Sequence, residues 1–229
     1  SMPTSPPDGP QQPAFKPRGV FQYLLTHCRG VFATVVLIPA SLVFGCYARL
    51  RAAAARRRHS APELHDARVR HVAEQVCRWG EEGAPVRLTT SRSGWSAMSP
   101  YVAAHKKTSR AIDMPMYDII AVNEDRATVT VEPFVTMGRL TRALNARGWT
   151  PAVVPELDGL TVGGLINGFG VESSSHKYGL FQYTVESLDV VTPDGQLRHC
   201  SAAENADLFY TIPWSHGTLG FLVAAELKL

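Results

Sequence analysis

Residues 160–181 have the sequence LTVGGLINGFGVESSSHKYGLF, and four glycines (163, 164, 168 and 170) fall within its first eleven residues. Glycine has no Cβ atom, so these positions can adopt positive φ and let backbone N–H groups approach an anion. Thr161 and the serines at 173–175 add hydroxyl donors for a phosphate or a ribose. The stretch predicts a phosphate-binding loop, and the alternative is a glycine-rich surface loop that binds nothing.

The glycine spacing does not fit a dinucleotide-binding Rossmann unit. Gly168 and Gly170 are followed by Ser173, where the GxGxxG pattern has its third glycine. The neighbouring elements are also ordered differently from βαβ units, because short helices are expected between pairs of strands. We therefore expect an α+β fold.

Local patterns around this stretch predict the elements of that fold. Ser60 and Glu63 form a capping-box pattern before apolar residues at helical spacing, and Thr136 and Gly148 bracket a second short helix. The expected helices cover residues 61–82 and 136–148; the expected strands are 85–90, a pair within 112–133, a hairpin over 185–200 with its turn at 193–195, and an apolar strand closing 207–229.

An uncharged run of nineteen residues, 30–48, precedes this folded part. A helix of about 20 apolar residues can cross a bilayer, and five arginines (49, 51, 56, 57 and 58) follow the run. The more positive flank usually stays cytosolic, which places residues 59–229 in the cytosol. We expect a disordered tail and membrane-proximal segment at 1–29, a transmembrane anchor at 30–48, a basic flank at 49–58 and one folded domain at 59–229. A buried core helix and a cleaved signal peptide are the alternatives.

Composition narrows the function classes. The 229 residues carry a net charge of +3, which argues against a dedicated nucleic-acid binder. The cysteines at 28, 46, 77 and 200 form no CxxC pair, and the histidines show no metal-ligand spacing. We expect reduced cysteines, no metal site and no nucleic-acid partner.

Five strings occur in the order found in a known family. They are SRSGWS (91–96), VTVEPFVTMGRLTRALNARGW (129–149), residues 160–181, LDVVTPDGQL (188–197) and DLFYTIPWSHGTLGFLVAAEL (207–227). Together they resemble the PCMH-type FAD-binding domain of the vanillyl-alcohol-oxidase and p-cresol-methylhydroxylase superfamily, and within it the membrane-anchored Δ24-sterol reductases. The resemblance runs from about residue 20 to the end of the chain.

The resemblance implies an FAD-binding domain of two small α+β lobes, with the substrate-covering domain lying beyond residue 229. It also implies NADPH as reductant, a sterol substrate reduced at its C24 double bond in cholesterol-type biosynthesis, and a single-pass endoplasmic reticulum protein whose catalytic domain is cytosolic. Catalytic residues stay unassigned. The implied cofactor-binding residues are Arg92, Ser93, Gly94, Trp95, Thr161, Val162, Gly163, Gly164, Leu165, Ile166, Asn167, Gly168, Phe169, Gly170, Val171, Glu172 and Ser173.

Trp95 departs from the pattern of relatives that attach flavin covalently. Many of them carry a histidine there, and an indole cannot form the histidyl bond, so we expect FAD to be held non-covalently. Two other functions stay open. One is an oxidase of the same fold acting on a sugar lactone or alcohol; the other is a non-catalytic, truncated, membrane-anchored flavin-binding protein.

Overall fold

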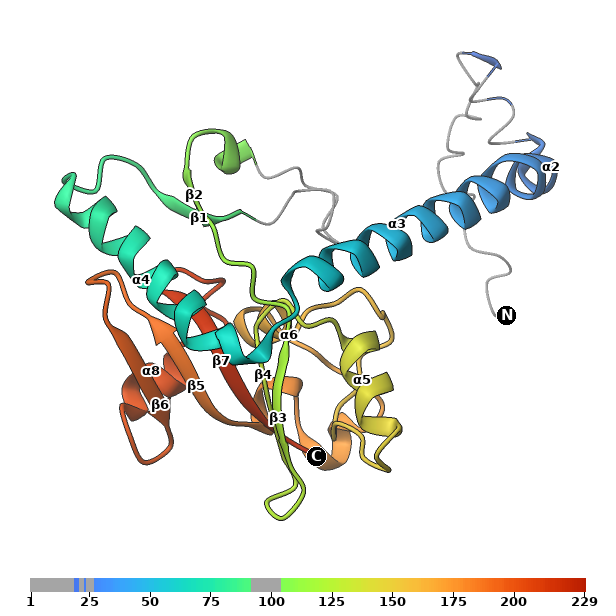
Figure 1. The fold of residues 1–229 in the computed structure, drawn as a ribbon. Coiled ribbons are helices and arrows are strands. Elements are labelled where there is room, and N and C mark those ends of the chain that lie inside the picture. Colours follow the sequence, from blue (N-terminus) through green and yellow to red (C-terminus); the bar gives the residue numbers. More distant parts are fainter. Residues whose placement is uncertain (1–18, 21–22, 24–26, 92–103) are drawn as a thin grey trace, which may run out of the picture. The chain divides into compact units, whose positions relative to one another are not determined.

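The computed structural model describes residues 19–20, 23, 27–91 and 104–229 (Figure 1). Most of the predicted tail at 1–29 therefore lies outside the described residues. The chain separates into two compact units, Ser1–Ala55 and Arg56–Leu229.

The first unit contains the predicted apolar helix. It begins with α2 (Arg29–Phe32), widens to a π-helical segment at Ala33–Leu37 and continues as α3 (Ile38–His59). Pro39 has no N–H group and its ring crowds the carbonyl four residues earlier, which accounts for a widened turn just before it. Among the described residues, Arg29–Tyr47 is the one helical stretch long and apolar enough to cross a membrane, with a mean hydropathy of 2.0 and no buried residue.

The second unit contains two sheets, which confirms the α+β class. A five-stranded antiparallel sheet has the order β3 (Ile119–Asn123), β4 (Thr128–Val131), β7 (Phe221–Lys228), β5 (Val185–Val191) and β6 (Leu197–Ser201). A smaller sheet pairs β1 (Leu88–Thr90) in parallel with β2 (Arg110–Ile112), a strand that the sequence patterns did not predict.

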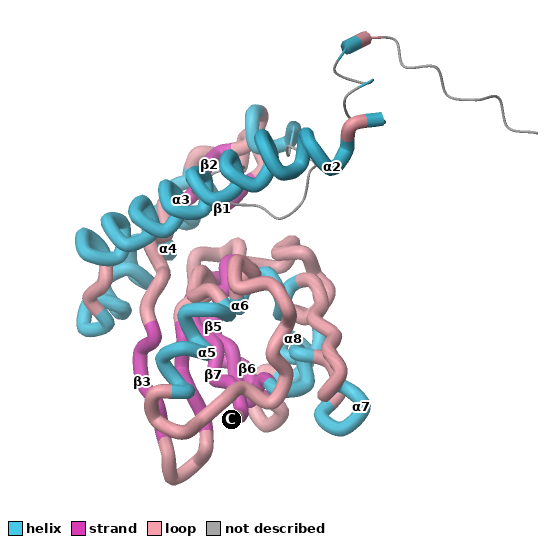
Figure 2. Tube along the Cα trace, turned by 90° about the vertical axis from the view of Figure 1, so that its right-hand side faces the viewer, coloured by secondary structure: helices cyan, strands magenta, loops and turns pink. Residues whose placement is uncertain are grey.

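Helices cover both faces of the large sheet (Figures 1 and 2). On one face, α4 (His65–Glu81) packs the valines 69, 72 and 76, which are spaced at helical periodicity, against Val191 and Val223. The other face holds α5 (Met137–Asn145), α6 (Val162–Asn167) and α8 (Ala206–Thr211). Leu140 of α5, Leu165 of α6 and Ile212, the C-cap residue of α8, join Leu188 and Val190 in the larger core.

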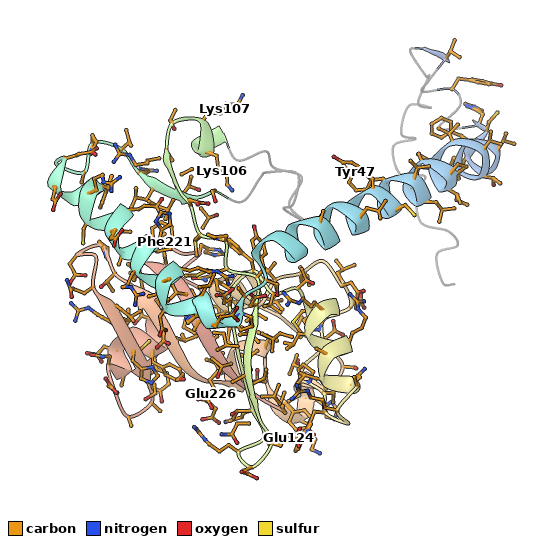
Figure 3. The ribbon with its side chains drawn as sticks, viewed as in Figure 1. Tyr47, Lys106, Lys107, Glu124, Phe221 and Glu226 are labelled. Atoms are coloured by element: carbon orange, nitrogen blue, oxygen red, sulfur yellow. The ribbon has the colours of Figure 1, made fainter. Side chains whose placement is uncertain are left out.

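Strand β7 is consequently apolar on both faces. Phe221 lies beside α4, whereas Glu226 lies towards the turn between β3 and β4 (Figure 3). The pairing with β5 steps from Ala224 opposite Asp189 to Leu222 opposite Val190, so Val223 is an extra residue in the ladder. This irregularity turns Val223 towards α4 while Leu222 and Ala225 face the larger core.

The predicted ends of α5 are confirmed. The Thr136 hydroxyl accepts the N–H of Arg139 at 3.4 Å. At the other end Gly148 has φ +81°, and the Trp149 N–H donates to the Leu144 carbonyl at 3.1 Å. The Trp149 bond, together with the positive φ of Gly148, is typical of the Schellman motif, which a glycine at this position favours.

The predicted capping box at Ser60 is wrong. Helix α4 begins at His65, after a 3₁₀ turn over Pro62–Leu64. The Ser60 hydroxyl donates to Asp118 Oδ1 at 2.6 Å, and the Ala61 N–H donates to Asp118 Oδ2 at 2.8 Å. A buried carboxylate from a distant part of the chain takes the place of the local capping bond, and sequence spacing does not reveal such a partner.

The remaining predicted elements are largely confirmed. The 193–195 turn joins β5 and β6, with Gly195 at φ +75°. The final segment differs in part, because α8 occupies its first residues and only Phe221–Lys228 is strand.

Candidate cofactor site

The stretch 160–181 is not one loop. It begins with the short helix α6, whose N-cap Thr161 accepts the Gly164 N–H at 3.3 Å. Val162, Leu165 and Ile166 form the buried face of α6 in the larger core. An irregular segment over residues 168–171, here called the tip, follows α6 and leads to α7 (Ser175–Tyr178).

The glycines of this stretch are explained by close packing. None of Gly163, Gly164, Gly168 and Gly170 has positive φ, contrary to the sequence-based expectation. A Cβ atom at Gly163 would lie 2.7 Å from Pro133 Cβ, and one at Gly168 would lie 2.9 Å from the Gly164 carbonyl oxygen. A side chain at Gly168 would therefore disturb the fold as well as any ligand.

The N–H groups of the first turn of α6 already have partners. Val162 donates to the Val135 carbonyl at 2.9 Å and Gly163 to the Pro133 carbonyl at 2.8 Å. At the tip the situation differs: within the described part of the chain, the N–H groups of Phe169 and Val171 have no hydrogen-bond acceptor. A ligand with acceptor atoms would therefore find its donors at the tip and not at the start of α6.

The tip is held in place by one buried side chain. Gln182 Nε2 donates to the Gly168 carbonyl at 2.6 Å, and Gln182 Oε1 accepts the Gly170 N–H at 3.4 Å. This amide bonds the backbone on both sides of Phe169 and so fixes the conformation of the tip.

A second segment, 214–217, lies beside the tip, and sequence reasoning gave it no role. The His216 N–H donates to the Asn167 carbonyl at 3.0 Å, and the Ser215 hydroxyl donates to Asn167 Oδ1 at 3.2 Å. Trp214 stacks on Phe169 with ring centroids 5.6 Å apart. The sequence offered one signal for this segment, the string Trp-Ser-His-Gly at 214–217, which the structure places between α8 and β7.

The predicted site residues fall into three groups. Six are buried, and their side chains belong to the core or to internal contacts: Thr161, Val162, Gly163, Leu165, Ile166 and Gly170. Seven are exposed or half-buried around the tip: Gly164, Asn167, Gly168, Phe169, Val171, Glu172 and Ser173. The last four, Arg92, Ser93, Gly94 and Trp95, lie outside the described residues.

The polar end of the stretch closes its own turn. Glu172 accepts the Glu156 N–H at 2.8 Å, and its own N–H donates to the Ser175 hydroxyl at 3.0 Å. His176 Nδ1 lies 2.6 Å from the Ser173 carbonyl oxygen. These bonds fix the backbone after the tip, so Ser175 acts here in a local turn.

Two lysines lie near the end of β1, where the string SRSGWS (91–96) begins. Lys106 and Lys107 end a 3₁₀ turn just before β2 (Figure 3), and Lys106 Nζ lies 3.5 Å from the Thr90 carbonyl oxygen. Thr90 is the last residue of β1. The ammonium group of Lys106 therefore adds positive charge at the end of that strand, which suits a phosphate-bearing ligand.

The fold and the tip fit a flavin-binding domain, and comparison with known proteins agrees. The chain matches the family described as "FAD binding domain" over residues 67–201, more than half its length, and it belongs to that family. Among curated relatives, Delta(24)-sterol reductase of Homo sapiens is 48% identical over 208 residues, which is 91% of this chain and 40% of the relative. The Delta(24)-sterol reductase of Arabidopsis thaliana is 42% identical over 72% of this chain and 30% of the relative.

Solved structures share the fold at low identity. Chitooligosaccharide oxidase superposes with a TM-score of 0.59 at 23% identity, covering 70% of this chain and 33% of its own. The 6-hydroxy-D-nicotine oxidase from Arthrobacter nicotinovorans gives 0.55 at 18% identity, covering 69% and 33%. The chain spans about 40% of the length of the human sterol reductase, 30% of the Arabidopsis one and one third of each oxidase.

Among the described residues, no group of three or more His, Cys, Asp or Glu side chains is placed to hold a metal ion. The arrangement instead offers amide donors, an aromatic surface and lysine charge, which are the elements of an organic cofactor site.

Proposed function

We propose that this chain is the FAD-binding part of a membrane-anchored, NADPH-dependent Δ24-sterol reductase of cholesterol-type sterol biosynthesis. The observation that carries the proposal is 48% identity to Delta(24)-sterol reductases over 91% of the chain, a share large enough that it must include the tip. The sterol substrate, NADPH and the endoplasmic reticulum location are parts of the proposal.

The exposed residues around the tip fit FAD. The N–H groups of Phe169 and Val171 suit acceptor atoms, and the aromatic surface beside them suits a flat ring. Lys106 and Lys107, in the 3₁₀ turn before β2, carry positive charge that suits the two phosphates of FAD. Bound FAD would supply hydride to the alkene and would itself be reduced by NADPH.

The attachment of the cofactor is proposed to be non-covalent. An indole at position 95 offers no imidazole nitrogen for a bond to the flavin ring. Binding then depends on the donors and apolar contacts of the chain, and acid precipitation is expected to release all flavin into the supernatant.

Reduction of an isolated alkene also demands a proton. No carbonyl stands next to the double bond to accept negative charge, so a general acid must protonate one carbon in a dry pocket. We assign that acid to none of the described residues. The role proposed for this chain is to bind and orient the cofactor.

Membrane attachment is proposed through Arg29–Tyr47. This helix is long enough to span a bilayer, and the arginines after it favour a cytosolic second unit. A sterol is insoluble in water, so an enzyme held at the bilayer can take its substrate directly from the membrane.

An oxidase is the second candidate, because two solved structures that share this fold are named oxidases. The two functions differ in what becomes of the electrons. A reductase consumes NADPH and saturates a sterol side chain, whereas an oxidase passes electrons to oxygen and forms peroxide.

The test uses membranes containing the natural polypeptide that includes this chain, supplied with FAD, NADPH and a sterol bearing a C24 double bond. The expected result is loss of the double bond coupled to NADPH oxidation, with little peroxide. Peroxide formation from a sugar lactone or alcohol without NADPH would establish the oxidase instead. Flavin binding with neither reaction would indicate a non-catalytic flavoprotein.

A further inference from the structure

Phe169 and Trp214 form an exposed aromatic pair beside the tip. Their rings stack at 16° with centroids 5.6 Å apart, yet Phe169 is 59% exposed and Trp214 is 50% exposed. Val171, two residues further along the tip, is 56% exposed. Large apolar side chains at and beside the tip thus remain in contact with water, which is typical of a binding surface.

The pair is held in a fixed place. Trp214 has φ +71° and His216 has φ +52°, a region in which residues other than glycine are strained. The bonds from Ser215 and His216 to Asn167 hold this conformation against the strain. On the other side, Gln182 holds the backbone of Gly168 and Gly170 around Phe169.

Donors and apolar surface therefore meet within a few residues. Among the described residues the N–H groups of Phe169 and Val171 have no acceptor, and the aromatic pair starts at Phe169 itself. A matching ligand needs a flat apolar part joined to an edge rich in acceptors. The isoalloxazine ring has both, because its dimethylbenzene end is apolar and its pyrimidine end carries carbonyl oxygens and ring nitrogens. Adenine lacks the apolar end, and a sterol lacks the acceptor edge.

We propose that Phe169 and Trp214 form the stacking surface for the isoalloxazine ring of FAD, with the Phe169 and Val171 N–H groups as donors to its acceptor edge. This inference rests on the proposed FAD-binding function and adds to it the residues that recognise the ring. The electron-rich indole stacks well on the electron-poor flavin ring, since offset stacking of unlike rings is favourable.

The test compares FAD binding by the full 229-residue chain and its Phe169→Ala, Trp214→Ala and Trp214→Phe variants, purified in detergent. Tyr210→Ala is the matched control, because Tyr210 is an exposed aromatic residue on α8 outside the pair. Removing an aromatic ring from a stacked base weakens binding by about ten-fold or more, and we expect that loss for each alanine variant. Trp214→Phe keeps a ring and is expected to stay within about three-fold of wild type.

Two further measurements identify the ring and rule out a loss of structure. Riboflavin, which lacks adenine, is expected to quench tryptophan fluorescence in the wild-type chain, and this quenching is expected to fall in Trp214→Phe. ADP, which lacks isoalloxazine, is expected to bind wild type and alanine variants alike. Melting temperatures of the apo proteins are expected to agree within a few degrees, since both side chains are exposed.

The outcomes separate this inference from the cofactor proposal. Wild-type affinity in both alanine variants, or a loss confined to ADP binding, would overturn the stacking surface while leaving FAD binding intact. A wild-type chain that binds neither FAD nor riboflavin would overturn both.

Discussion

Gly195 shows how a single residue determines the contact between α4 and the β5–β6 hairpin. Its φ of +75° is one that residues with a side chain rarely adopt, and a Cβ atom there would overlap Cys77 Sγ on α4. Gly148 has a similar φ of +81° but open space around its Cα atom. A residue with a side chain would therefore be strained at both positions, but only at Gly195 would its Cβ atom also overlap a neighbour.

Replacing Gly195 by alanine is expected to destabilise the chain more than replacing Gly148. Positive φ costs an L-residue about 1–2 kcal/mol at either site. The overlap with Cys77 adds to this only at Gly195, so the free energy of unfolding should fall by at least about twice as much. Urea unfolding measures both values. Adding Cys77→Ala to the Gly195→Ala variant should recover part of the difference, and equal losses at the two glycines would contradict the packing argument.

Among the elements, a buried charge cluster joins the helices to the strands. Asp118 and Glu132 flank the β3–β4 hairpin and are both fully buried. Arg68 on α4 lies 2.9 Å from Asp118 and 3.1 Å from Glu132, and Arg139 on α5 lies 3.2 Å from Asp118. Burial opposes ionisation of Asp118, but hydrogen bonds from Ser60, Arg68, the Ala61 N–H and Arg139 outweigh it and lower the pKa of that carboxyl group.

The Asp118→Asn variant is expected to lose about 3–5 kcal/mol of stability at neutral pH, because it leaves the buried Arg68 and the half-buried Arg139 short of a partner. A lowered pKa in the folded state means that the Asp118 contribution is present above the unfolded pKa of about 4 and is lost as the pH falls below it. Wild type should therefore lose stability more steeply than the variant on acidification, as measured by unfolding between neutral and acidic pH.

Asp113→Asn is the control for this experiment. Asp113 is exposed and lies 3.8 Å from His71 in a surface pair, so its replacement should change stability by less than about 1 kcal/mol. An Asp118→Asn variant as stable as Asp113→Asn would show that the cluster contributes little to holding the elements together.

At the scale of the whole molecule, the first unit contains an apolar helical window and the second unit has a core of its own. Every residue of the Arg29–Tyr47 window is outside any core, whereas the second unit has buried apolar clusters on both faces of its sheet. Nineteen such residues left in water would be strongly unfavourable, which supports the proposed bilayer environment.

Placing charge in the middle of that helix tests the anchor. Leu42→Arg with Val43→Arg should cost roughly 2.5–3.5 kcal/mol per residue for membrane insertion. Alkaline carbonate should therefore extract the double variant from membranes and leave the wild type behind. Leu50→Arg, beyond the span, should remain in the pellet. Extraction of the wild type would remove the anchor from the proposal.

Protease added to sealed microsomes tests the orientation separately. Digestion of residues 59–229 is expected, since the arginines after the span favour the cytosol. Complete protection would reverse the topology while leaving the anchor itself in place.

Elements with local signals were predictable from the sequence. The alternation at 128–131, the Thr136 and Gly148 ends of α5, and the Pro-Asp-Gly turn at 193–195 all appear in the structure. Each depends on interactions within a few residues, which pattern rules describe well. The apolar helix follows from composition in the same way.

Contacts between distant residues were not predictable. Ser60 bonds Asp118 across 58 positions in sequence, and Ser215 bonds Asn167 across 48. The glycines at 163, 168 and 170 were expected to let the backbone approach an anion, whereas the atoms that they approach in the structure belong to Pro133, Gly164 and Phe181. No periodicity encodes which partner a side chain meets after the chain has folded back on itself.

By itself, then, the sequence determined the α+β class, the order of most elements, the apolar helix and the region around residues 160–181 as the candidate site. The tertiary structure alone decided which backbone groups of that region have partners and which residues join it. The N–H groups of Val162 and Gly163 have acceptors, those of Phe169 and Val171 have none among the described residues, and Trp214 lies on Phe169. The reason is physical: helix and turn preferences act over about four residues, whereas hydrogen-bond satisfaction and packing are settled among groups that meet only in the folded chain.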